Sequence, residues 1–256
     1  MSKFYLLSPL VLQTLLWPFT KIFFGFFGHF KIKGLENLKN LRKDRGVVFA
    51  VNHTSELDPI IVPASLPFLS PLMPMFYTSR EKSFYNNSGW RQIFYGGFFF
   101  KIWGAHPLNS GKKNYGISLK NHIKILKAGQ SLCIFPEGRT TRDGELQEGR
   151  GGVAYLSDML HCPIVPVYIG GVYRLSLKEI LFRKRTFTVS FGKPVYREEI
   201  LQDKQFRSVA DYKAGAQIIM RKIAELKNEK NISLWPGPRT SVPGSASPVG
   251  NVVRKS

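Results

Sequence analysis

The feature that most limits how this chain can fold is an apolar run that stops abruptly in polar residues. Residues 47–51, Val-Val-Phe-Ala-Val, are rich in β-branched side chains, which predicts a buried strand. His53 follows almost at once, and Asp58 stands five residues after it. We expect Thr54 or Ser55 to cap a helix that begins near Asp58, because a hydroxyl satisfies free N–H groups of a first helical turn.

This order places His53 and Asp58 at the carboxyl end of a strand, where open α/β sheets bind their ligands. A carboxylate one turn into the helix can hydrogen-bond one imidazole nitrogen. That contact fixes the tautomer and leaves the other nitrogen free to accept a proton. His53 and Asp58 are therefore candidate catalytic residues. The alternative interpretation is a solvated loop histidine, because a single His-x4-Asp pattern is short.

A second apolar run, residues 131–135, also ends in a polar loop. That loop carries, in order, Glu137, Gly138, Arg139 and Arg142. Two guanidinium groups beside glycine-containing backbone suit a phosphate, because arginine binds its oxygens in a fork and backbone N–H groups add donors. The alternative is a surface loop in which an arginine pairs with Glu137 or Asp143.

Arg150 precedes a glycine-rich helix start at residues 151–154. A helix amino terminus presents free N–H groups and the positive end of the helix dipole, so Arg150 is a further candidate for binding phosphate. Residues 149–154 also match Gly-x-Gly-x-x-Ala. No strand precedes them, however, and a dinucleotide site needs strand, turn and helix together.

The two loop motifs together resemble the paired signatures of the glycerolipid acyltransferase superfamily, in particular its PlsC-type 1-acylglycerol-3-phosphate acyltransferases. They are Asn-His-Thr-Ser-Glu-Leu-Asp at 52–58 and Phe-Pro-Glu-Gly-Arg-Thr-Thr at 135–141. The resemblance covers about residues 30–200. It implies that His53 is a general base oriented by Asp58. It also implies that the substrate phosphate is bound by Glu137, Gly138, Arg139, Arg142 and Arg150.

The implied reaction moves a fatty acyl group from acyl-CoA or acyl carrier protein to the sn-2 hydroxyl of 1-acylglycerol-3-phosphate, giving phosphatidic acid. No metal or cofactor is expected, and the chain has no Gly-x-Ser-x-Gly nucleophile motif. The implied partners are lysophospholipid, the acyl donor and the membrane lipid bilayer. The alternatives are an acyltransferase with another acceptor, such as glycerol 3-phosphate or another lysophospholipid, and a non-enzymatic basic membrane-binding protein.

This sequence departs from the family pattern at two places. The family places an arginine three residues after the glutamate, where Thr140 stands here. Its third motif ends in arginine, where Ser110 stands, and Lys112 or Lys113 is the expected substitute. Which basic side chain holds the phosphate is therefore left open.

The charge of the chain favours anionic partners. Lys and Arg number 37 against 17 Asp and Glu, giving a formal net charge of +20. With the resemblance, this predicts anionic lipid and phosphorylated substrate rather than nucleic acid, and a protein associated with the cytoplasmic face of the cell membrane. Cys133 and Cys162 lie in apolar runs and are expected to be buried free thiols.

Residues 4–30 are strongly apolar but are interrupted by Pro9, Pro18 and Lys21. A simple transmembrane helix needs about 20 unbroken apolar residues. We therefore expect an uncleaved, membrane-immersed pair of short helices. One spanning helix and one buried soluble helix are the alternatives.

The remaining periodicity predicts an α/β fold with a mixed, largely parallel central sheet flanked by helices. Expected domains are membrane-associated helices at 1–30, an α/β acyltransferase domain at 31–230 and a disordered basic tail at 231–256. Further strands or apolar strand-like stretches are expected at residues 30–36, 72–78, 98–108, 163–171 and 186–192. Helices are expected at residues 57–66, 88–95, 115–126 and 212–226.

Overall fold

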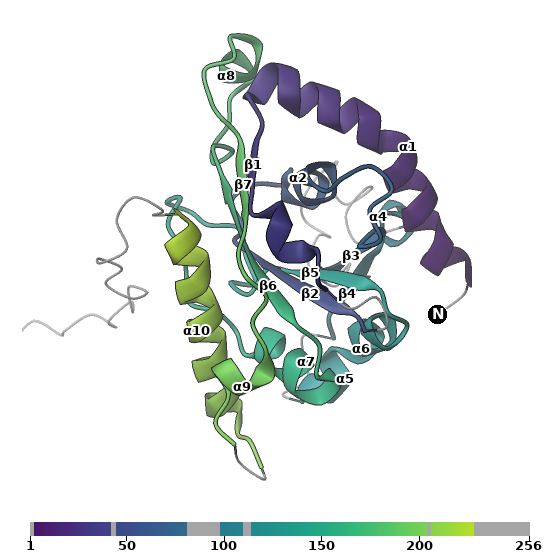
Figure 1. Cartoon of the computed structure of the whole chain (residues 1–256), viewed down its shortest axis with the longest axis vertical. Helices are drawn as coiled ribbons and strands as arrows, with labels where there is room; N and C mark the ends of the chain where they lie inside the picture. The colour runs from purple at the N-terminus through teal and green to yellow at the C-terminus, as the bar shows by residue number, and fades with distance from the viewer. Residues whose placement is uncertain (1–2, 42–44, 81–97, 110–113, 204–205, 228–256) are drawn as a thin grey trace, which may run out of the picture.

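A computed structural model describes residues 3–41, 45–80, 98–109, 114–203 and 206–227 of the chain. Its centre is a seven-stranded sheet with the order β1-β7-β6-β2-β5-β3-β4 (Figure 1). The strands are β1 (Lys31–Lys33), β2 (Val47–Val51), β3 (Met75–Ser79), β4 (Ala105–Pro107), β5 (Ser131–Ile134), β6 (Ile164–Gly170) and β7 (Thr188–Phe191).

Five neighbouring strands, β6, β2, β5, β3 and β4, run parallel to one another. β7 pairs antiparallel with β6, and the short edge strand β1 runs parallel to β7. This confirms the prediction of a mixed, largely parallel sheet flanked by helices. The carboxyl ends of β2 and β5 are adjacent in this arrangement, so the two loops that carry the sequence motifs leave the same edge of the sheet.

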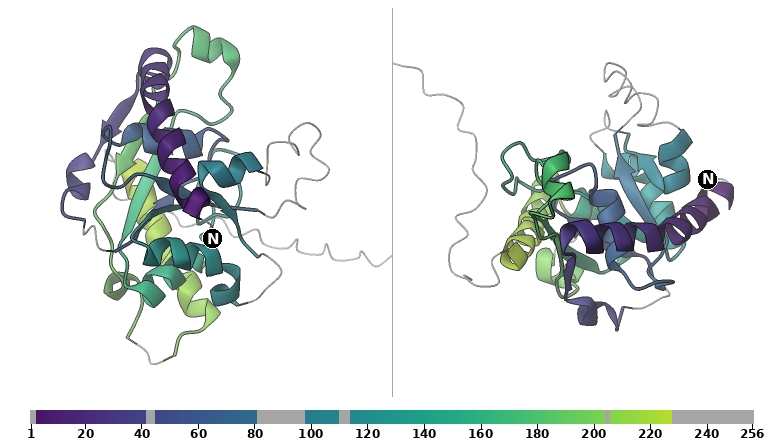
Figure 2. Two further views of the ribbon diagram at one scale, coloured as in Figure 1. Left: turned by 90° about the vertical axis from the view of Figure 1, so that its right-hand side faces the viewer. Right: turned by 90° about the horizontal axis from the view of Figure 1, so that it is seen from above.

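Helices cover both faces of the sheet (Figures 1 and 2). The longer helices are α1 (Lys3–Gly28), α2 (Asp58–Ser65), α6 (Lys120–Lys127), α7 (Gly152–Leu160) and α10 (Val209–Lys227). The shorter ones are η1 (Leu35–Leu38), α4 (Phe98–Trp103), α5 (Tyr115–Ser118), α8 (Leu177–Leu181) and α9 (Arg197–Ile200).

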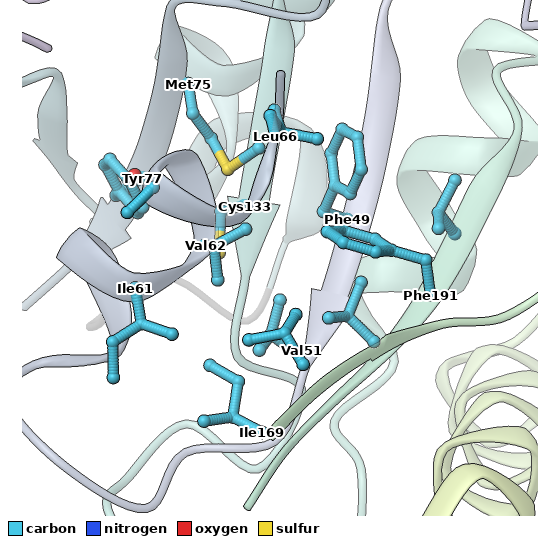
Figure 3. Close-up of a cluster of buried hydrophobic side chains, with 14 of the residues drawn as sticks. Phe49, Val51, Ile61, Val62, Leu66, Met75, Tyr77, Cys133, Ile169 and Phe191 are labelled. Carbon is cyan, nitrogen blue, oxygen red and sulfur yellow. The ribbon is translucent and has the colours of Figure 1, made fainter. Parts of the chain in front are cut away.

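The two core layers follow from the alternation of side chains along the central strand β2. Phe49 and Val51 point to the layer beneath α1 and α2, whereas Val48 and Ala50 point to the layer beneath α6, α7 and α10. All four side chains are fully buried. Figure 3 shows the first layer, with Phe49 and Phe191 packed edge to face at 6.3 Å between ring centroids. A strand buried on both faces explains why the whole run 47–51 is apolar.

The expected pair of short amino-terminal helices is wrong, because residues 3–28 form the single helix α1. Pro9 and Pro18 both lie inside it. A proline in a helix interior costs about 3 kcal/mol. Docking along the helix offsets that cost: the Gln13 side chain donates to Met75 O at 2.7 Å and accepts from Met75 N at 2.9 Å, and Trp17 Nε1 donates to Leu66 O at 3.0 Å.

The opposite face of α1 is exposed and apolar, so the buried-helix alternative is also wrong. Only 11% of its most apolar 18-residue window is buried, and by length and composition α1 could cross a membrane. The exposed side chains are Phe4, Leu7, Leu10, Val11, Leu15, Leu16, Phe19, Ile22, Phe23 and Phe26. A monomeric soluble protein rarely leaves so large an apolar surface uncovered.

Several smaller predictions of secondary structure differ from the structure. The stretch 98–108 divides into α4 and β4 because Gly104, at φ +101°, turns the chain between them. The helix expected at 115–126 breaks at Leu119, whose φ of −103° and ψ of 11° lie outside helical geometry. Two short helices, α8 and α9, were not predicted. Cys133 and Cys162 are buried free thiols, as expected.

Some predictions lie outside the described residues. They are the helix at 88–95, the basic turn with Ser110, Lys112 and Lys113, and the tail at 231–256.

Candidate active site

The catalytic pair expected from the sequence is assembled at the carboxyl end of β2. His53 Nδ1 lies 2.9 Å from Asp58 Oδ2. The His53 side chain retains 20% of its exposure, whereas that of Asp58 retains none. The geometry therefore fixes one imidazole nitrogen against a buried carboxylate and leaves Nε2 toward the accessible side. This is the arrangement that general-base chemistry needs.

Asp58 is supported by backbone donors as well as by His53. Its Oδ2 atom accepts from Thr54 N at 2.7 Å and from Ser55 N at 3.0 Å. Asp58 is also the first residue of α2, so the helix dipole favours its negative charge. These contacts compensate the carboxylate for the loss of water and fix its position.

The expected cap of α2 is wrong. The N-cap residue is Leu57, which makes no side-chain cap, and neither Thr54 nor Ser55 occupies that position. Ser55 Oγ accepts instead from Leu57 N at 3.1 Å. The Ser55 hydroxyl is thus engaged within the loop, and Asp58 N donates to the backbone carbonyl Ser55 O at 3.3 Å instead.

Phe135 and Thr140 fix the ring of His53 from the neighbouring loop. Phe135, at the end of β5, stacks on the imidazole at 4.1 Å between centroids and 19° between planes. Thr140 Oγ1 lies 3.2 Å from His53 Nε2. A hydroxyl therefore already occupies the position from which an alcohol would give its proton to Nε2.

Glu137 links the loop that follows β2 to the loop that follows β5. Its Oε1 atom accepts from the backbone N–H of His53 at 3.0 Å, and its Oε2 atom accepts from Gln147 N at 3.1 Å. Thr141 N donates to His53 O at 2.8 Å and adds a second link. Glu137 is 3% exposed. Burial raises the pKa of its carboxyl to about 7, although the two backbone N–H groups oppose the shift.

Gly138 and Arg150 are brought together, as the phosphate prediction requires. Gly138 adopts φ +69°, and an added Cβ there would lie 2.8 Å from Arg150 Nε. Arg150 N donates to Pro136 O at 2.8 Å, and α7 begins two residues later. The guanidinium of Arg150 thus lies over the glutamate loop beside a helix amino terminus.

Arg139 and Arg142 lie on the same loop with exposed side chains. The backbone carbonyl of Arg142 accepts a hydrogen bond from Tyr173 Oη, which fixes the chain there. Of the predicted basic residues that the structure describes, Arg139, Arg142 and Arg150 lie at one edge of the sheet, and Arg150 is the one packed against Gly138.

Arg80 was missed by the sequence analysis. It follows β3 directly, and its Nη2 atom donates to Gly138 O at 3.0 Å. A basic residue immediately after a strand next to β5 was the available signal, since the carboxyl ends of parallel strands meet at one edge of a sheet. Thr140 was noted only for standing where the family has arginine. Its contact with His53 requires the tertiary structure.

The site thus combines a His–Asp pair, whose imidazole is partly exposed, with a basic loop at the switch from strand to helix. Such a constellation on an α/β sheet can activate a hydroxyl for attack while holding an anionic group nearby. The family model named Acyltransferase matches residues 29–170, which is more than half of the chain. The protein therefore belongs to the acyltransferase family and is an enzyme of that class.

Two curated relatives share about a quarter of their residues with this chain. The 1-acyl-sn-glycerol-3-phosphate acyltransferase of Limnanthes douglasii is 26% identical over 205 residues, covering 73% of this chain and 67% of that protein. The enzyme of the same name from Bacillus subtilis (strain 168) is 28% identical over 196 residues, covering 75% and 87%.

A solved structure shows the same fold. The crystal structure of the 1-acyl-sn-glycerophosphate acyltransferase PlsC from Thermotoga maritima superposes with a TM-score of 0.55 at 20% identity. The match covers 87% of this chain and 80% of that one. The helix-flanked sheet is therefore the fold of a known acyltransferase.

Proposed function

We propose that this protein transfers a fatty acyl group from an acyl thioester to the sn-2 hydroxyl of 1-acylglycerol-3-phosphate, giving phosphatidic acid. The observation that carries the proposal is the contact of 2.9 Å between His53 Nδ1 and buried Asp58, with Nε2 facing a hydroxyl beside a basic loop. The curated relatives that bear this activity in their names support the choice of acceptor.

The proposed chemistry needs one proton transfer and one acyl transfer. An alcohol is a poor nucleophile at neutral pH, so His53 Nε2 removes its proton as the oxygen attacks the thioester carbonyl. Asp58 holds the imidazole in the required tautomer and stabilises the imidazolium that forms. The C–S bond then breaks, and the proton leaves with the thiol. No cofactor is needed, because the thioester is already activated.

The basic residues position the acceptor in this proposal. Arg150, beside the amino terminus of α7, is the leading candidate for the phosphate, with Arg139, Arg142 and Arg80 contributing positive charge around it. Glu137 has both oxygens engaged by backbone N–H groups, so we assign it to positioning His53 rather than to contacting substrate.

We further propose that α1 lies in the membrane surface rather than across the bilayer. The helix is docked along its length, through Gln13, Trp17 and Phe24, onto the rest of the domain. A crossing helix would draw that domain into the lipid, whereas a helix in the surface buries only its exposed apolar face. We place this surface on the cytoplasmic side, where the acyl donors are made.

The test uses the full chain in mixed micelles with 1-acylglycerol-3-phosphate and long-chain acyl-CoA, following thiol release and phosphatidic acid. Replacing His53 with alanine should reduce turnover by about 10³–10⁴, the upper range for a lost general base. Activity that survives His53→Ala overturns the mechanism. Parallel assays with acyl carrier protein as donor, or with glycerol 3-phosphate or other lysolipids as acceptor, decide the substrates separately from the chemistry.

A further inference from the structure

A second apolar and basic surface lies beside the carboxyl end of α1, on the excursion between β6 and β7 that carries α8 (Figure 1). Leu177, Leu181 and Phe182 are 75%, 63% and 70% exposed there. Lys178, Arg183 and Lys184 stand among them, also exposed. We call these six residues the α8 patch. Neither the sequence motifs nor the proposed chemistry uses it.

The α8 patch is held in a defined shape. Ser176 and Glu179 form a capping box at the start of α8, with Ser176 N donating to Glu179 Oε2 at 3.0 Å. Arg185 Nη2 lies 2.7 Å from Glu179 Oε1, and Arg185 Nη1 donates to Tyr173 O. Several contacts therefore hold this segment in a conformation that exposes its large apolar side chains.

The patch is also joined to α1. The guanidinium of Arg183 lies 4.8 Å from the ring centroid of Phe26, one of the exposed side chains of α1. Phe26 and the α8 patch are therefore neighbours, where the carboxyl end of α1 lies beside α8 (Figure 1). Whatever covers the exposed face of α1 at this end meets the α8 patch as well.

The charge around the patch selects the kind of partner. Residues 172–186 contain five basic side chains and one acidic one, Glu179, which is paired with Arg185. Lys184 Nζ lies 5.8 Å from the ring centroid of Phe182, so a cation stands directly beside an apolar group. Leucine and phenylalanine rimmed by lysine and arginine are the composition of elements that bind anionic lipid surfaces.

From this geometry we propose that the α8 patch is a second membrane contact, which binds a bilayer containing anionic lipid together with α1. The proposal rests on the in-surface position proposed for α1. A helix lying in a surface can rotate about its long axis, whereas a second contact away from that axis fixes the rotation. The patch would therefore set how the active site faces the bilayer.

The test places an environment-sensitive fluorophore on Leu181→Cys in the full chain. Cys133 and Cys162 are 0% and 1% exposed and will not compete for the label. The control label is on Glu198→Cys in α9, at the opposite end of the molecule (Figure 1). Both proteins are bound to vesicles of phosphatidylcholine with phosphatidylglycerol and isolated by flotation. Flotation itself tests the proposed membrane binding of α1.

On the floated protein, the label at 181 should shift its emission to the blue and be protected from aqueous iodide, and the label at 198 should not. Equal quenching at both positions overturns the α8 contact, even if flotation shows that α1 binds, and would point to a protein partner for the patch. A chain that does not float overturns both proposals. Vesicles of phosphatidylcholine alone should reduce the protection at 181.

A charge variant tests the basic rim without a label. The double variant Lys178→Gln, Lys184→Gln should partition onto anionic vesicles about tenfold to thirtyfold more weakly, since each basic side chain at such a surface adds to binding. The matched control removes two exposed lysines of α6, Lys124 and Lys127, in the same way. Equal losses in the two variants would mean that only net charge matters, which would overturn the patch. Turnover in neutral micelles should be unchanged in both.

Discussion

Asp58, at the start of α2, and Arg142, on the loop after β5, lie at the same edge of the sheet, yet their surroundings are opposite. Asp58 is fully buried and accepts hydrogen bonds from two backbone N–H groups as well as contacting His53. Arg142 is exposed, and its backbone carbonyl, rather than its guanidinium, makes the contacts that anchor the loop. One loop fixes a proton acceptor in place, and the other presents positive charge to the outside.

The two regions differ because proton transfer and phosphate binding place different requirements on the position of a side chain. Proton transfer requires donor and acceptor within hydrogen-bond distance, so a small displacement of His53 would abolish it. Attraction between a guanidinium and a phosphate falls only slowly with distance, so it tolerates exposed, less constrained side chains. The buried loop should therefore respond far more strongly to a single substitution than the basic loop.

Replacing Asp58 with asparagine should produce the largest effect after the loss of His53. All three contacts with Thr54 N, Ser55 N and His53 go to Oδ2, which an amide oxygen could replace, but the amide carries no charge to stabilise the imidazolium, so turnover should fall by about 10² or more. The loss of charge-assisted hydrogen bonds should also lower the free energy of unfolding by about 1–3 kcal/mol. Denaturant titration and initial rates measure the two effects. The matched control is Asp203→Asn, at a fully exposed carboxylate, and an equal fall in both would contradict a special role for Asp58.

Glu137→Gln tests the link between the two loops through pH. The folded-state pKa of Glu137 is raised from 4.5 to about 7 by burial. As pH rises, the Glu137 carboxyl therefore loses its proton at a lower pH in the unfolded chain than in the folded one. Between pH 4.5 and 7 the free energy of unfolding of the wild type falls relative to that of the glutamine variant, by up to about 3 kcal/mol. Above pH 7 the difference should be constant.

Denaturant unfolding of both proteins across this pH range measures that difference. His106 and His122 have pKa values lowered to about 4 by burial, which gives an opposite slope common to both proteins, so only their difference is informative. Parallel stability curves would show that Glu137 does not titrate there. Glu148→Gln, on the same loop, serves as the control.

The basic loop should yield graded effects on KM. Arg150→Ala should raise KM for a phosphorylated acceptor about tenfold or more, because a charge-assisted hydrogen bond is lost beside a helix amino terminus. Both side chains are exposed, but it is Arg150 that packs against Gly138, so Arg142→Ala should raise KM only a few-fold. Arg221→Ala on α10 controls for net charge. A reversed order, with Arg142 dominant, would assign the phosphate to the outer part of the loop.

Thr140→Val should have the smallest effect. Its hydroxyl lies at His53 Nε2 and must give way to the acceptor, so removing it should lower KM by roughly twofold to fivefold and leave kcat unchanged. Steady-state kinetics with wild type, Thr140→Val and Thr140→Ser decide this. A fall in kcat as large as that of Asp58→Asn would instead place Thr140 in the chemistry itself.

Much of the fold followed from the sequence because its signals are local. The run at 47–51 is apolar at every position, which is what a strand buried on both faces requires, and it forms β2. The spacing of His53 and Asp58 allows a contact across the loop between β2 and the first residue of α2, so that pair was predictable too. The helix cap was not, because the Ser55 hydroxyl bonds Leu57 N within the loop and Asp58 N is bonded to the backbone carbonyl of Ser55 instead.

What the sequence alone determined is the position of the central strands and of the longer helices within the domain, the His–Asp pair, the basic loop and the family. Only the tertiary structure decided that α1 is one helix, since Gln13 and Trp17 find partners 62 and 49 residues away that outweigh two prolines. It also decided that Glu137 turns inward, that Thr140 meets His53 and that Arg80 reaches Gly138. These contacts join strands that are neighbours in the sheet but distant in the chain, and no local pattern of residues encodes such proximity.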